Sequence, residues 1–208
     1  MSHHPQNKVA KVGVRVGVHI AAFGLLCLAA SPAFAHIGAH DAMDLSAGFA
    51  HPFTGLDHLL AMIAVGIWAA QMKGNAKWVL PLTFPLMMVV GAVPGMMGID
   101  LSGVEIGIAT SVAVLGVLIA CAARVPTWLG AALVAAFAVV HGYAHGAELP
   151  HQASAGFYGA GFIVATALLH LIGLSASVFG NSKIAAHALR LLGGGIAACG
   201  VFLMAGAV

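Results

Sequence analysis

Two short motifs combine histidines with a carboxylate inside a chain that is otherwise strongly apolar. Their ionisable residues are His51, Asp57 and His58 in the first motif, and His141, His145 and Glu148 in the second. An ionisable side chain in a bilayer costs roughly 2.5–3.5 kcal/mol even on an insertion scale, so grouping several of them suggests a purpose. Imidazole and carboxylate form a ligand set for divalent transition metals, and the motifs therefore predict a metal pathway. Polar contacts between helices are the alternative.

The spacing of the first motif fits a helix that starts near His51. Proline is favoured at the first helical position, where Pro52 stands. His58 follows His51 by two turns on the same face, ~10 Å along the axis. Asp57 points about 100° away from His58, either as a further ligand or as a partner that orients an imidazole. The alternative is that His51 caps the helix and that Asp57 is incidental.

The second motif places three polar side chains on one stripe of one helix. His141 and His145 are four residues apart, a spacing at which two imidazoles chelate one ion. Glu148 follows about one turn later on the same stripe. If the two helices run in opposite directions, His51 and Glu148 share one level, and His58 and His141 share a level ~10 Å deeper.

Other candidate ligands lie outside the two motifs. His170 stands in the middle of a later apolar segment, either as a further ligand or as a polar residue bonded across helices. His36 would become the N-terminal residue after signal cleavage, and with His40 it forms either an external capture arm or a functionless tail end. Ser102-Gly-Val-Glu105 fits a capping box, which explains Glu105 without a metal.

The composition is that of an integral membrane protein. The 208 residues are 61% hydrophobic and only 7% charged, and the mean hydropathy is +1.02. A soluble domain is nearer 25% charged. The formal net charge of +2 and the scattered basic residues give no sign of nucleic-acid binding. Three cysteines without paired spacing indicate neither a disulfide framework nor a thiolate metal site.

Six apolar segments, each near the ~20 residues that span a bilayer, predict an all-α bundle of six transmembrane helices. We expect them at 53–72, 78–97, 103–122, 127–147, 157–179 and 184–206, after a short polar stretch from 36 to 50. Glycines four residues apart predict close helix packing. The pairs are Gly91 with Gly95, Gly103 with Gly107, and Gly142 with Gly146. The missing side chains of Gly142 and Gly146 would also leave room for an ion.

The N-terminus predicts a cleavable signal peptide over residues 1–35, and the six-helix transmembrane permease domain then occupies residues 36–208. Basic residues precede an apolar run that ends at the small residues Ala33 and Ala35. With the mature N-terminus in the periplasm, the cytoplasmic loops of the inner-membrane protein hold Lys73, Lys77, Arg124 and Lys183. This agrees with the positive-inside rule, and six crossings return the C-terminus to the periplasm.

The motifs resemble those of the HupE/UreJ family of nickel permeases. The family signature H-P-x-x-G-x-D-H-x-x-A-M matches this chain from His51 to Met62. The second pattern, F-H-G-x-A-H-G-x-E, matches from His141 to Glu148, with Val140 in place of the usual phenylalanine. The resemblance extends to the signal peptide, the six spans and the histidine beside the cleavage site, and so covers nearly the whole chain.

The resemblance implies uptake of Ni²⁺, or of Co²⁺ as in relatives, for the maturation of hydrogenase or urease. The ion is then the transported substrate, and no permanent cofactor or enzymatic activity is expected. Two other classes stay open. One is a membrane haem protein, since paired histidines ligate haem, and the other is a structural accessory protein of a hydrogenase. Histidine and carboxylate bind several divalent metals, so the ligand types alone do not select nickel.

Overall fold

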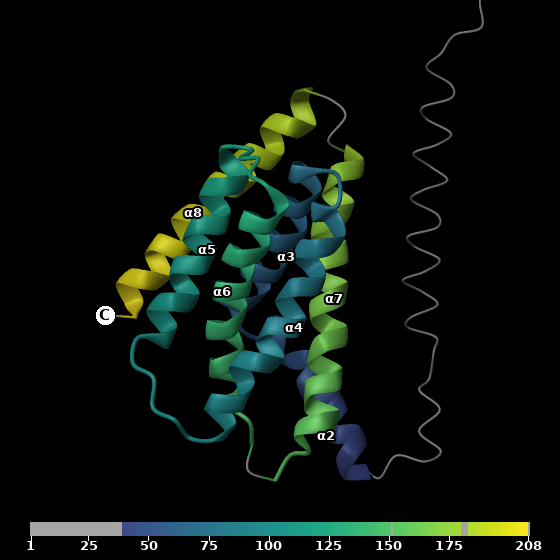
Figure 1. The fold of residues 1–208 in the computed structure, drawn as a ribbon, viewed down its shortest axis with the longest axis vertical. Coiled ribbons are helices and arrows are strands. Elements are labelled where there is room, and N and C mark those ends of the chain that lie inside the picture. Colours follow the sequence, from purple (N-terminus) through teal and green to yellow (C-terminus); the bar gives the residue numbers. More distant parts are fainter. Residues whose placement is uncertain (1–38, 151, 180–182, 208) are drawn as a thin grey trace, which may run out of the picture. The chain divides into compact units, whose positions relative to one another are not determined.

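The computed structural model describes residues 39–150, 152–179 and 183–207, and these ranges form helices joined by short loops (Figure 1). The predicted signal peptide and His36 lie outside the described residues. The helices are α2 (Ala39–Ala50), the 3₁₀ helix η1 (His51–Phe53), α3 (Leu56–Met72), α4 (Ala76–Met96), α5 (Val104–Ala120), α6 (Thr127–Ala147), α7 (Ala155–Phe179) and α8 (Lys183–Gly206).

The six predicted apolar segments correspond to α3 through α8. Four of these helices, α4, α6, α7 and α8, are long and apolar enough to cross a membrane. At 17 residues each, α3 and α5 are shorter, but α3 passes the same test when it is joined to the residues before it. Those two pieces, Met43–Phe53 and Leu56–Met72, meet at a bend of 79°, so they form either a broken span or a re-entrant loop.

Most of the short polar stretch over residues 36–50 forms helix α2, which was not predicted from the sequence. This helix packs against α7, and two glycines allow the backbones to touch: a Cβ at Gly48 would meet the Tyr158 carbonyl, and one at Gly161 would meet the Leu45 carbonyl. The Asp44 carboxylate also accepts a hydrogen bond from the Ser154 backbone N–H at 2.7 Å. These contacts hold η1, which follows α2, beside the start of α7.

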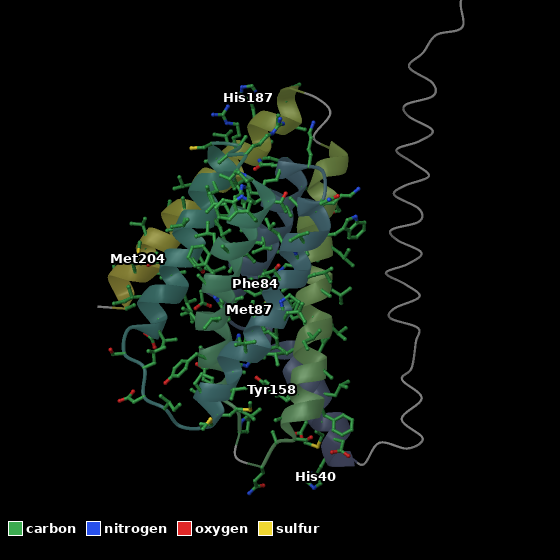
Figure 2. All side chains as sticks on the ribbon, viewed as in Figure 1. His40, Phe84, Met87, Tyr158, His187 and Met204 are labelled. Atoms are coloured by element: carbon green, nitrogen blue, oxygen red, sulfur yellow. The ribbon has the colours of Figure 1, made fainter. Side chains whose placement is uncertain are left out.

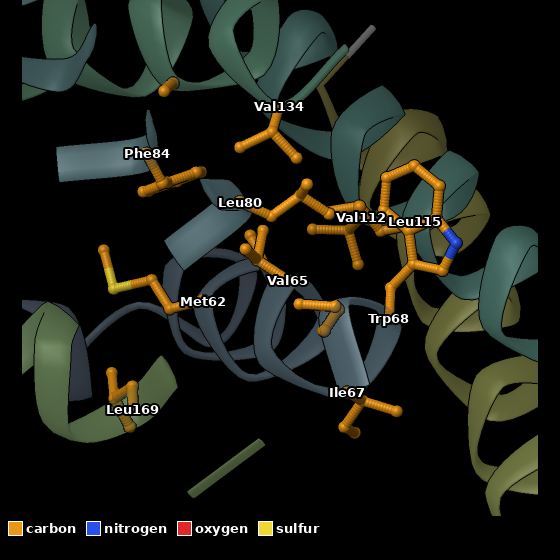
Figure 3. Close-up of a cluster of buried hydrophobic side chains, with 14 of the residues drawn as sticks. Met62, Val65, Ile67, Trp68, Leu80, Phe84, Val112, Leu115, Val134 and Leu169 are labelled. Carbon is orange, nitrogen blue, oxygen red and sulfur yellow. The ribbon is translucent and has the colours of Figure 1, made fainter. Parts of the chain in front are cut away.

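Helix α3 occupies the centre of the hydrophobic core. Its buried side chains Met62, Val65 and Trp68 meet residues from four other helices (Figure 3). The partners labelled there are Leu80 and Phe84 of α4, Val112 and Leu115 of α5, Val134 of α6 and Leu169 of α7. The Trp68 indole N–H donates to the Ala123 carbonyl at 2.9 Å, which ties the far end of α3 to the loop after α5.

The predicted close packing is confirmed for two glycine pairs, those of α4 and α6, and among the described helices these two pack most extensively. It was wrong for Gly103, which lies before α5 with no atom within 4 Å of its Cβ position. A Cβ at Gly91 or Gly95 would overlap the backbone of α6, and one at Gly142 or Gly146 would overlap the backbone of α4. The Cβ positions of Gly142 and Gly146 are therefore filled by the α4 backbone. The expectation that they leave room for an ion was wrong.

Charged residues separate to opposite ends of the helices. All six acidic residues of the chain lie on α2, in the first turn of α3 or α5, in the α4–α5 loop or at the C-terminal end of α6. Helix α2 and the α4–α5 and α6–α7 loops are at the lower end of Figure 1. They are Asp41, Asp44, Asp57, Asp100, Glu105 and Glu148. The described basic residues lie toward the other end, where the Arg190 Nε–H donates to the Ala120 carbonyl at 2.7 Å.

Candidate metal site

The structure brings both motifs together at the acidic end of the helices. His51 on η1 and Glu148 at the end of α6 lie at one level, with 3.5 Å between His51 Nε2 and Glu148 Oε2. His145, one turn before Glu148, completes a group of three residues whose potential ligand atoms all lie within 4.8 Å of one another. We refer to His51, His145 and Glu148 as the outer triad.

A second pair of imidazoles lies next to the outer triad, deeper in the helix bundle. The ring centroids of His58 on α3 and His141 on α6 are 5.2 Å apart. His145 connects the two levels, because its ring lies 4.9 Å from that of His51 and 4.5 Å from that of His58. The two predicted levels are therefore present, and the four imidazole rings form a continuous row. The predicted helix from His51 was wrong, because His51 lies on η1 and α3 begins only at Leu56.

Two of these imidazoles, those of His58 and His141, are oriented by hydrogen bonds that Nδ1–H donates. Asp57 Oδ1 lies 2.7 Å from His58 Nδ1 and also accepts the His58 backbone N–H at 2.8 Å. The Phe137 carbonyl lies 2.9 Å from His141 Nδ1. Since a carbonyl or carboxylate oxygen only accepts, each Nδ1 carries the proton and each Nε2 keeps its lone pair. Asp57 thus acts on His58 as an orienting partner, as is usual for histidines that bind metals.

The ring nitrogens that remain have no protein partner. Among the described residues, His58 Nε2, His141 Nε2 and both nitrogens of His145 are buried without a hydrogen bond. A buried polar atom left unsatisfied costs about 1–3 kcal/mol, so such atoms are rare unless a ligand or water reaches them. Converging imidazole lone pairs with a carboxylate at one side fit a divalent transition-metal ion.

Aromatic side chains of α7 and α4 pack around the imidazoles. Phe162 lies 4.2 Å from the His145 ring, and Tyr158 lies 5.9 Å from the His51 ring, both measured between centroids. On the other side, Phe84 stands edge-on to His141 at 5.4 Å. These contacts limit rotation of the rings and keep the pairs of imidazoles facing one another.

A cavity of about 530 Å³ leads from the surface to the site. Its lining includes Asp57, His58, Glu105 and Glu148, together with apolar residues of α5, α6 and α8. Glu105 and Glu148 are both exposed, so the cavity opens at the acidic end. We call this cavity the acidic vestibule. A separate cavity of about 160 Å³ reaches His145 from the α4 and α7 side and is otherwise almost wholly apolar.

Glu105 was missed as a site residue because the sequence favoured a capping box. The structure contradicts that interpretation, since the residue before α5 is Gly103, in the left-handed region with φ +78°, and no side chain caps the helix. Glu105 is therefore free to face the vestibule. The signal that would have identified it is its position in the first turn of an apolar helix, at the same end as Asp57 and Glu148.

The three remaining candidates differ in their position. His170 on α7 is buried, and its ring centroid lies 5.4 Å from that of Phe84, which is also 5.4 Å from that of His141. His40 is exposed on α2, well away from Phe84 in Figure 2, and it is not part of the described cluster. His36 lies outside the described residues.

Comparison with known proteins supports one assignment. A family model described as "HupE / UreJ protein" matches residues 24–203, a range that contains both motifs. The protein named "Protein HupE" from Rhizobium leguminosarum bv. viciae is 43% identical over 176 residues, which cover 85% of this chain and 92% of that protein. No solved structure matches.

Proposed function

Because the chain belongs to the HupE/UreJ family, we propose that it is a transporter that imports Ni²⁺, or Co²⁺, from the periplasm for the maturation of a hydrogenase or urease. The family consists of membrane transport and accessory proteins rather than enzymes, and it is associated with nickel and cobalt transport. The direction of transport and the route through the helices are our proposal.

The observation that carries the proposal is the column of imidazole nitrogens without hydrogen-bond partners, which lies deeper in the helix bundle than the acidic vestibule. A hydrated cation is attracted by Asp57, Glu105 and Glu148, and it then exchanges water for the nitrogens of His51 and His145. His58 and His141 take it one level deeper. Conduction needs sites that bind and also release, and levels with two or three ligands suit this better than a closed cage.

The function is tested by uptake of radioactive ⁶³Ni into bacterial cells that lack other nickel transporters. Cells producing the chain should accumulate nickel above the vector control, and excess Co²⁺ should compete while Mg²⁺ should not, because imidazole is a poor ligand for Mg²⁺. Accumulation no higher than in control cells would contradict the proposal. An absorption spectrum of the purified protein addresses the haem alternative, which requires a Soret band.

We further propose an inner-membrane orientation with the acidic end in the periplasm. The segregation of basic residues to the opposite end supports it, since basic loops stay in the cytoplasm. Cleavage of residues 1–35 would leave the mature N-terminus at His36 on the periplasmic side. If α3 through α8 each cross the membrane, the C-terminus lies on that side as well.

Reporter fusions test this orientation. A reporter that is active only in the periplasm should be active after Val208 and inactive at Lys183, because these positions lie at opposite ends of α8. The same fusion at Arg124, in the α5–α6 loop, should also be inactive and serves as an internal control. The reverse pattern would place the acidic vestibule in the cytoplasm, and the chain would then be better interpreted as an exporter or a sensor.

A further inference from the structure

One buried stripe of α7 follows the candidate metal path and continues beyond it. Tyr158, Phe162, Thr166 and His170 are four residues apart, so they lie on one face, and all four are buried. The first two contact the rings of His51 and His145. The stripe therefore extends two further turns past the imidazole column, and the last residue is again a histidine.

The His170 side chain forms no hydrogen bond that joins the helices. It is 2% exposed, and neither ring nitrogen has a hydrogen bond within the described part of the chain. On the α4 side the Pro81 carbonyl lies near the ring without forming such a bond. That carbonyl lacks its helical donor, because residue 85 is also a proline and has no N–H. Two groups able to bind a cation thus face each other across α4 and α7.

Two further donors lie one turn nearer to the imidazole column. The Thr166 hydroxyl lies 3.5 Å from Met62 Sδ, and both residues are completely buried. Met62 follows His58 by one turn of α3, so its thioether continues the line of ligands down that helix. In Figure 3, Met62 lies between Phe84 of α4 and Leu169 of α7.

Phe84 contacts both this group and the imidazole column. Its ring is edge-on to His141 and to His170, at 5.4 Å in both cases. Phe84 is fully buried and itself offers no ligand atom. His170 lies two turns beyond Phe162 on α7, so an ion that leaves the imidazole column for His170 moves deeper along α7 beside this ring.

We propose that His170, Met62 and Thr166, with the Pro81 carbonyl, form a second binding site for the transported metal ion, inward of the imidazole column. This inference rests on the proposed function and adds an inner site to it. The step from Tyr158 to His170 is ~18 Å along α7, and α7 continues for ~14 Å beyond, which places the site near the middle of the bilayer. An ion that travels the length of α7 needs a binding site between the two ends of the helix.

The chemistry of the inner site differs from that of the outer triad. Imidazole, thioether, hydroxyl and carbonyl are all neutral, and the thioether is a soft ligand that Mg²⁺ and Ca²⁺ avoid. Neutral ligands bind a divalent ion more weakly than a carboxylate does, so the inner site releases its ion readily. Near His170 the backbones of α3 and α7 touch, because a Cβ at Gly66 would overlap the His170 carbonyl and one at Gly173 the Ile63 carbonyl.

The first test separates binding from translocation in purified protein. In proteoliposomes, His170→Leu should lower the saturated rate of Ni²⁺ uptake by about tenfold or more, while half-saturation by external Ni²⁺ changes little. Leu169→Ala is the matched control, because Leu169 directly precedes His170 on α7 and is equally buried, but carries no ligand atom. It should transport at close to the wild-type rate once corrected for the amount of folded protein.

A second measurement does not depend on transport. Equilibrium dialysis with Ni²⁺ should show a weak site that remains in the double variant His51→Ala/His145→Ala and disappears when His170→Leu is added. Met62→Leu, which keeps the size but removes the sulfur, should weaken the same site. Equal Ni²⁺ binding with and without His170→Leu would overturn the inner site. Failure of the wild-type protein to transport nickel would instead overturn the proposed function, while the dialysis result still decides whether the inner site exists.

Discussion

Alanine in place of His145 should reduce nickel uptake at limiting metal by about 10–100-fold or more, while the protein remains in the membrane at normal abundance. The effect should be the largest among the six motif residues, because His145 makes the closest ring contacts with both levels of the site, whereas the rings of His51 and His58 are 6.3 Å apart. Its ring lies 4.9 Å from His51 and 4.5 Å from His58, and neither of its nitrogens is engaged by the protein. Its removal therefore interrupts the column of ligands at its centre.

The other motif residues should follow a graded pattern in the same ⁶³Ni assay. Single alanines at His51, His58, His141 and Glu148 remove a ligand atom, whereas alanine at Asp57 removes the partner that orients His58. Val140→Ala is the control, since Val140 precedes His141 on α6, lies beside Gly107 and carries no ligand atom. Normal uptake by both His58→Ala and His141→Ala would show that the two-level pathway is wrong.

Alanine at Gly142 should destabilise the folded protein, although the change adds a single methyl group. The new Cβ would overlap the carbonyl of Met88 and stand 2.7 Å and 2.8 Å from two other backbone atoms of that residue. A backbone cannot rotate away as a side chain can, so α4 and α6 must separate. Overpacking of this kind costs about 1–3 kcal/mol and sometimes more. We expect a lower unfolding temperature in detergent and a weaker apparent metal affinity, because α6 carries His141 and His145.

Gly194→Ala on α8 is the matched control for this prediction. Gly194 is exposed, and no atom lies within 4 Å of the position that its Cβ would take. Alanine stabilises a helix by about 0.5–1 kcal/mol relative to glycine, so this variant should unfold at the same temperature or a slightly higher one. Equal unfolding temperatures for Gly142→Ala and wild type would mean that α4 and α6 do not touch as closely as the structure has them.

Helix periodicity predicted the geometry of the candidate site in part. It set His51 level with Glu148 and His58 level with His141. The single helix assumed for His51 and His58 was wrong, because His51 lies on η1, α3 begins only at Leu56, and the two pieces meet at a bend of 79°. The structure has both pairs in contact. The metal itself and the role of each residue as a ligand stay predictions, because the same side-chain positions would suit several divalent ions.

Features that depend on contacts between distant segments were not predictable in this way. Helix α2 was expected to be a polar stretch, since its own composition does not reveal that Asp44 meets Ser154 or that Gly48 meets Tyr158. The capping box failed for a local reason: Gly103 adopts a left-handed conformation, so the chain enters α5 one residue later than Ser102 requires. Phe84 drew no attention, because an aromatic residue in an apolar helix is ordinarily core.

Because of where the acidic residues lie, the outer part of the proposed ion path is negatively charged and the inner part is neutral. Asp57, Glu105 and Glu148 surround the vestibule and the outer triad, so two or three negative charges offset the two positive charges of an ion bound there. Since all six acidic residues of the chain lie at that end, an ion at His170 has only neutral ligands and carries its full charge of +2. Moving two charges through a potential of 100 mV releases about 4.6 kcal/mol, enough for more than a thousandfold concentration ratio. The carboxylates stay in place while the ion moves, so the work done by the potential depends on how far the ion travels through the membrane. Because the vestibule opens at the exposed residues Glu105 and Glu148, most of that distance lies beyond the outer triad. In the proposed importer, the cell's electrical gradient therefore drives mainly the inward part of the journey.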